Sequence, residues 1–167
     1  MKKILVVCAL SQELNTVKQK IKSLKLKNVK ISFFTTWKGN YLSILNLSRF
    51  LENNNFDFIV NIWVCGYLEK SHIFQVSRIY NLSNSKELIV PTIISYPELW
   101  SIVTSEKVVY NSSILEEENF VDMESYGLEI VCDSFKIPRV FIKVPVDKVW
   151  TETINFDHFD AFVTADK

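Results

Sequence analysis

A nearly continuous apolar run, Phe58–Cys65, is the sequence feature that most constrains the fold of this chain, with Asn61 as its only polar residue. A strand without alternation between apolar and polar residues has to be covered on both faces, as the strands of parallel sheets are. The run is also too short to span a bilayer. We therefore expect a buried central strand over Phe56–Cys65, in a sheet that carries helices on both sides.

Strands and helices are expected to alternate in the segment that precedes this run. Apolar and β-forming residues predict strands over Lys2–Ala9 and Val29–Thr36. Apolar residues at helical spacing predict a helix capped by Ser11 and a second helix over Asn40–Asn53.

The second half of the chain is richer in expected strands. They cover Phe74–Tyr80, Leu88–Ile94, a pair of short strands within Ser101–Tyr110, and Val140–Val146, with a helix over Met123–Phe135 and a short helix in the tail Thr151–Lys167. This order predicts a three-layer α/β/α sandwich with a mixed central sheet. A chain of 167 residues with 48% hydrophobic content, and with neither repeat nor linker, is expected to form a single domain over residues 1–167.

Charge and glycine content exclude several classes of function. The 19 acidic and 19 basic residues cancel, so no net field favours binding to nucleic acid. The three glycines cannot build a dinucleotide-binding or P-loop motif.

The cysteines and histidines indicate neither a disulfide framework nor a metal site. Cys8, Cys65 and Cys132 are odd in number, lie among apolar residues and lack C-x-x-C spacing, which favours buried reduced thiols. His72 and His158 lack metal-ligand spacing, and we expect no metal and no other cofactor. The start of the chain has no convincing signal-peptide cleavage site, which favours a cytoplasmic protein that does not enter a membrane.

Acidic residues stand at the expected junctions between elements. Asp122 and Glu124 lie at the start of the helix over Met123–Phe135, and Asp147 follows the strand over Val140–Val146. In α/β sheets, ligands bind outside the carboxyl ends of strands. We therefore expect Glu124 and Asp147 to face one cleft, an arrangement that suits acid catalysis on a polar small molecule better than it suits packing.

These residues resemble the superfamily of purine nucleoside phosphorylases and nucleosidases, which includes methylthioadenosine/adenosylhomocysteine nucleosidase. The matching segments follow the family's order: Val6–Glu13, Thr36–Asn40, Val60–Gly66, Asp122–Glu124, and finally Asp147. The match covers most of the chain, in a shortened and divergent form. The resemblance implies a nucleoside phosphorylase-like fold, in agreement with the predicted sandwich.

The resemblance also implies roles for individual residues. Glu13 would orient or activate the attacking water, and Asp147 would protonate the departing purine at N7. Glu124 would bind the ribose hydroxyls, with Met123 against the face of the sugar. The turn residues Gly66 and Val64 would complete the substrate-binding site. The chemistry is consistent, because N-glycosidic cleavage needs a proton for the leaving base and negative surroundings for the ribosyl cation.

The chain departs from the family at several positions of the site. Trp37, Trp63 and Tyr67 replace glycines, and Val146 replaces the serine before the aspartate. Large side chains at the turns are expected to fill core space or the space of the ligand. The phosphate-binding positions of the phosphorylases are occupied by Asn61 and Val64, which removes the charge-assisted donors for phosphate.

Three functions therefore stay open. Glu13, Glu124 and Asp147 favour a nucleosidase acting on a purine nucleoside or its 5′-thio derivative. The tryptophan substitutions favour a non-catalytic relative that binds a nucleoside or base, or that serves as a scaffold. A phosphorylase with an unrecognised phosphate site is the third.

The resemblance also implies self-association, because members of this family commonly associate. A homodimer or higher homo-oligomer is expected, through exposed apolar surface around Tyr67, Tyr96, Trp100 and Trp150.

Overall fold

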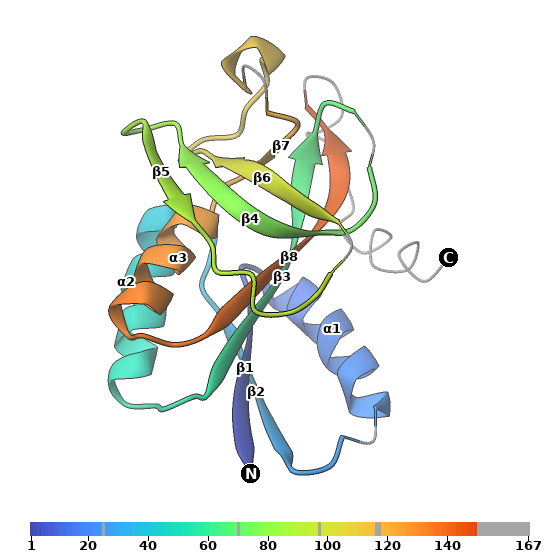
Figure 1. Ribbon diagram of the computed structural model, residues 1–167, viewed down its shortest axis with the longest axis vertical. Helices are drawn as coiled ribbons and strands as arrows, with labels where there is room; N and C mark the ends of the chain where they lie inside the picture. Colours follow the sequence, from blue (N-terminus) through green and yellow to red (C-terminus); the bar gives the residue numbers. More distant parts are fainter. Residues whose placement is uncertain (25, 70, 97, 116–117, 150–167) are drawn as a thin grey trace.

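The computed structural model describes residues 1–24, 26–69, 71–96, 98–115 and 118–149. Its elements are, in order, β1 (Lys2–Cys8), α1 (Ser11–Ser23), β2 (Val29–Thr35), α2 (Asn40–Glu52), β3 (Phe58–Tyr67), β4 (Phe74–Asn81), β5 (Lys86–Ile89), β6 (Leu99–Thr104), the short 3-10 helix η1 (Ser112–Leu115), β7 (Phe120–Asp122), α3 (Ser125–Ser134) and β8 (Arg139–Lys148). Figure 1 shows α2 and α3 side by side on one side of the sheet and α1 on the other.

Strand β1 illustrates why this sheet has two apolar faces. Leu5 and Val7 belong to one hydrophobic cluster, which also contains buried residues of α2 and α3. Val6 and Cys8 belong to a second cluster, together with Val17 of α1. Successive side chains of a strand point to opposite faces, so an unbroken apolar run joins both clusters. The predicted α/β/α sandwich with a mixed sheet is confirmed.

The sheet is more closed than the sequence predicted. Strands β2, β1, β3 and β8 pair in parallel, in that order. Strand β8 then pairs antiparallel with β4, β4 pairs parallel with β6, and β6 pairs parallel with β7. Strand β7 pairs antiparallel with β3, so the pairings β3–β8–β4–β6–β7–β3 close a ring. The short strand β7 thereby lies beside the last residues of β3, which in turn pair with the last residues of β8.

Three details of the sequence prediction are wrong. The N-cap of α1 is Leu10 rather than Ser11, and no side chain caps that end. The strand expected over Leu88–Ile94 instead covers Lys86–Ile89, where it pairs antiparallel with β4. The segment Ser101–Tyr110 contains the end of β6 rather than two strands, because the chain leaves the sheet after Thr104. Strand β7 was not predicted, because its 3 residues are too few for a periodic pattern.

The helix expected in the tail Thr151–Lys167 lies outside the described residues.

Helices α2 and α3 approach each other closely at their N-termini. The Gly127 amide donates a hydrogen bond of 2.8 Å to Oδ1 of Asn40. A Cβ atom at Gly127 would lie 2.6 Å from the Asn40 carbonyl oxygen, so only glycine fits at this crossing. The contact fixes the first turn of α3, which follows the acidic segment 122–124, against the start of α2.

Two surface properties bear on the predicted partners. In the part of the chain that the structure describes, no helix is long and apolar enough to cross a membrane. Trp100 is 42% exposed, whereas Tyr67 and Tyr96 are half-buried and Trp150 lies outside the described residues. Self-association through this surface stays a prediction.

Candidate active site

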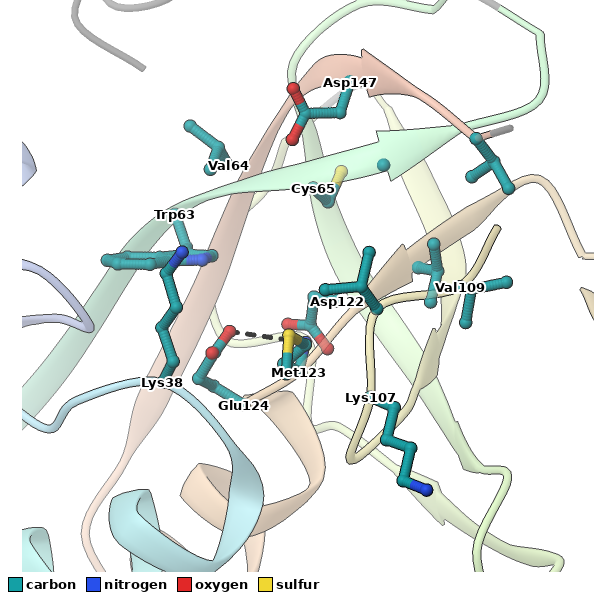
Figure 2. A pocket seen from close by; sticks show the side chains of 14 residues that line it. Lys38, Trp63, Val64, Cys65, Lys107, Val109, Asp122, Met123, Glu124 and Asp147 are labelled. Carbon is teal, nitrogen blue, oxygen red and sulfur yellow. Dashed lines mark hydrogen bonds between the residues drawn. The ribbon is translucent and has the colours of Figure 1, made fainter. Parts of the chain in front are cut away.

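A pocket of about 150 Å³ lies at the carboxyl ends of β3, β7 and β8. Strand β3 contributes residues 63–66 and the β7–α3 junction contributes residues 121–124. The end of β8 contributes Asp147, and Val149 follows that strand. Lys38 and the loop residues 107–109 complete the lining. The pocket forms here because ring closure brings three strand ends together (Figure 2).

Most of the site residues expected from the sequence line this pocket. Val64, Gly66, Met123, Glu124 and Asp147 are all part of its wall. Figure 2 shows the carboxylates of Asp147 and Glu124 on opposite sides of it, carried by different elements.

Glu13 is placed differently from the other expected site residues. It lies in the first turn of α1, is 2% exposed and is not part of the pocket wall. Neither of its carboxylate oxygens accepts a hydrogen bond of ordinary geometry from a described residue.

Backbone amides hold the Glu124 side chain at the N-terminus of α3. Gly39 donates a hydrogen bond of 3.0 Å to Oε1, and Met123 donates one of 3.3 Å to Oε2, drawn as the dashed line in Figure 2. Burial, followed by the charge of Asp122, raises the pKa of Glu124 to about 7, against the opposing influence of these amides and of Lys143. The carboxyl group can therefore hold or release a proton near neutral pH.

Glu13 is an electrostatic neighbour of Glu124. Burial, followed by the negative charge of Glu124, raises the pKa of Glu13 to about 8. The nearby Leu10 amide and the cations of Lys38 and Lys143 act in the opposite direction. With its pKa raised to about 8, the Glu13 carboxyl retains its proton around neutral pH.

Asp122, which is part of the pocket wall, forms a buried ion pair with Lys143. Lys143 is 0% exposed, and its Nζ lies 2.7 Å from Oδ2 of Asp122 and 3.0 Å from Oδ1 of Asn61. Asp122 also accepts hydrogen bonds from the Thr104 hydroxyl at 2.9 Å and from the amide and hydroxyl of Ser125. Lys143 is not among the site residues predicted from the sequence. A lysine within the otherwise apolar strand predicted over Val140–Val146 was the available signal, because such a charge needs a partner.

The two tryptophans that replace family glycines occupy different environments. Trp63 is 5% exposed and forms part of the pocket wall. Trp37 is 62% exposed, so the expectation that it fills the core or the ligand space is wrong. Its φ of 71° lies in the left-handed region that favours glycine. The backbone at Trp37 therefore keeps a glycine-like conformation although the side chain has changed.

The pocket offers neither an activated thiol nor a metal site within the described residues. Burial raises the pKa of the Cys65 thiol, which keeps it neutral. Across the described ranges, no group of His, Cys, Asp and Glu side chains is arranged to hold a metal ion.

Comparison with known proteins identifies the fold. No protein-family model and no curated protein matches the sequence. Among solved structures, the 5′-methylthioadenosine/S-adenosylhomocysteine nucleosidase (MTAN) of Campylobacter jejuni superposes with a TM-score of 0.78 at 17% identity, covering 99% of this chain and 96% of that chain. A variant MTAN of Chlamydia trachomatis, solved bound to MTA, gives 0.74 at 17% identity, with coverages of 99% and 89%.

A third solved structure agrees with these two. The nucleosidase of Neisseria meningitidis, in complex with methylthio-immucillin-A, gives a TM-score of 0.70 at 14% identity, covering 99% of this chain and 91% of that chain. The resemblance stated from the sequence is thus confirmed at the level of the fold: this chain folds as the methylthioadenosine/adenosylhomocysteine nucleosidases do.

Lys143→Met should destabilise the protein by about 3–5 kcal/mol, because it leaves the Asp122 carboxylate buried without its cation. Adding Asp122→Leu should recover part of that loss, since an apolar pair can replace a buried ion pair. Urea unfolding measures both effects, with Lys148→Met at the exposed end of β8 as the control. Strictly additive losses in the double variant would contradict the coupling.

Glu13→Gln should flatten the pH dependence of stability. The pKa values of Glu13 and Glu124 rise from 4.5 to about 8 and about 7 on folding, so over this range the folded state binds more protons than the unfolded state. Their stabilising contribution is complete below the unfolded pKa and is lost as the pH rises through the folded values. Urea midpoints should therefore fall between about pH 5 and about pH 9, and fall less in Glu13→Gln.

The exposed carboxyl group of Glu52 provides the control for this titration. Glu52→Gln should keep the wild-type slope of stability against pH. If Glu13→Gln also kept that slope, the Glu13 carboxyl would not be buried as described.

Proposed function

We propose that this protein is an N-ribosyl hydrolase that cleaves a purine nucleoside or its 5′-thio derivative. The observation that carries the proposal is the shared pocket of Glu124, Met123 and Asp147 on a nucleosidase-like fold. Solved neighbours bound to MTA and to methylthio-immucillin-A support this class of ligand.

The proposed reaction breaks the bond between C1′ of the ribose and N9 of the purine. Asp147 gives a proton to N7 of the base, which then leaves as a neutral molecule. Glu124 accepts hydrogen bonds from the ribose hydroxyls, and its charge stabilises the oxocarbenium-like ribosyl group. The oxygen of a water molecule joins C1′, and its proton passes to surrounding water, because Glu13, to which the resemblance assigns this proton, is not part of the pocket wall.

The residues at the family's phosphate positions favour water over phosphate as the nucleophile. The Asn61 amide donates to the Val7 carbonyl oxygen at 3.1 Å and accepts from Lys143, so both ends of its side chain are engaged. Val64 offers the pocket an apolar side chain without a donor. These positions supply no charge-assisted hydrogen bond to a dianion.

A second candidate function is a non-catalytic relative that binds a nucleoside or a base. The position of Glu13 favours it, because this carboxyl is buried away from the pocket wall while Trp63 is part of that wall. Adenine release from a panel of nucleosides distinguishes the two functions. For either function we propose a cytoplasmic protein that forms a homodimer or higher homo-oligomer. Light scattering measures the molar mass in solution and so tests the oligomeric state.

Asp147→Asn should lower turnover of purine nucleosides by about 10²-fold or more, the usual effect of removing a general acid. Glu124→Gln should weaken ribose binding as well as turnover. Adenine release measures the rates, and Asp133→Asn, whose side chain is 80% exposed on α3, is the control. Wild-type turnover in Asp147→Asn would reject its assigned role.

Nucleoside cleavage should be indifferent to added inorganic phosphate and should yield free ribose. Chromatography of the sugar product in the presence and absence of phosphate tests this expectation. A strict phosphate requirement, with ribose 1-phosphate as the product, would instead identify a phosphorylase.

A further inference from the structure

Trp63 belongs both to the pocket wall and to the hydrophobic cluster beside the first turn of α1. It lines the pocket, and Figure 2 shows its indole on the side of Lys38 and Glu124. The same side chain belongs to the hydrophobic cluster on the α1 face of the sheet, against which Leu10 and Leu14 pack. These leucines flank Glu13 in and before the first turn of α1.

Glu13 has the properties of a group cut off from its ligand. Its side chain is almost fully buried, and its oxygens accept no hydrogen bond of ordinary geometry from the described residues. A buried carboxyl in this state is costly unless another molecule can reach it. Yet Glu13 takes no part in the pocket wall, whereas its electrostatic neighbour Glu124 does.

The size of the pocket is consistent with an obstructing side chain. Its volume of about 150 Å³ is below the range of roughly 300–1,000 Å³ that is usual for sites enclosing a drug-sized ligand. An indole is the largest side chain that a protein can place in such a wall. Shortening Trp63 would both enlarge the pocket and open it toward α1.

We propose that Trp63 is the specificity-determining residue of this pocket: its indole separates Glu13 from the ligand and limits how much of a nucleoside the pocket encloses. The inference rests on the proposed ligand class, a purine nucleoside. It predicts that Glu13 contributes nothing to binding while Trp63 is present. Once the indole is removed, Glu13 reaches the ligand.

The test is a double-mutant cycle of Trp63→Leu and Glu13→Gln, with methylthio-immucillin-A as the binding probe and adenine release from MTA as the rate assay. Trp63→Leu should raise probe affinity by about 10-fold or more. Glu13→Gln should change the affinity by less than about 3-fold in the wild-type background and should abolish most of the gain in the Trp63→Leu background.

Two further variants keep the test decisive. Trp100→Leu replaces an exposed tryptophan away from the pocket and should leave probe affinity unchanged. Trp63→Phe removes less of the buried ring and replaces Trp63→Leu if circular dichroism shows that the latter is unfolded; a smaller gain in affinity is expected.

The outcomes separate this inference from the proposed function. A gain in affinity that depends on Glu13, without adenine release from any variant, supports the role of Trp63 and contradicts hydrolysis. Unchanged affinity in a folded Trp63 variant overturns the role of Trp63, even if the wild type releases adenine. An equal effect of Glu13→Gln in both backgrounds overturns it as well.

Discussion

The buried ion pair between Lys143 and Asp122 is the interaction on which the rest of this structure depends. A lysine ammonium removed from water is strongly unfavourable unless its charge and its hydrogen bonds are satisfied. Here a carboxylate on β7 and an amide oxygen on β3 satisfy them, while β8 carries the lysine. The Thr104 hydroxyl on β6 binds the same carboxylate. The partners of the Lys143 ammonium come together only when β3, β7 and β8 join in the closed ring, and their interaction in turn stabilises that ring.

The ion pair also organises the first turn of α3. Asp122 accepts hydrogen bonds from the amide and hydroxyl of Ser125, which begins the helix. The Gly127 amide donates a hydrogen bond to Asn40 at the start of α2. The Gly39 amide, which precedes α2, donates one to the Glu124 carboxyl group at the start of α3. These two bonds fix the Glu124 side chain between the N-termini of α2 and α3. Burial raises the pKa values of Glu13 and Glu124, and the positive charge of Lys143 acts to lower both. One cation thus supports both the architecture and the electrostatics of the pocket.

Trp37 and Trp63, both expected to replace glycines of the resembled family, differ in their effect on the pocket. At Trp37 the backbone retains a conformation natural to glycine and the indole is exposed to solvent, so that substitution leaves the pocket intact. At Trp63 the indole is buried in the pocket wall and belongs to the hydrophobic cluster on the α1 face of the sheet. The same type of substitution therefore has opposite consequences, depending on whether the side chain points outward or inward.

The sequence by itself determined the order of most strands and helices and the three-layer arrangement, because periodicity and apolar runs are local properties of the chain. It also showed that Glu124 and Asp147 stand at ends of elements, where ligands bind in such sheets. Strand β7, the closed ring and the partner of Lys143 were decided only by the tertiary structure, since each depends on pairing between distant residues. The separation of Glu13 from the pocket was likewise invisible in the sequence. It depends on the volume and direction of the Trp63 side chain, which the motif order does not encode.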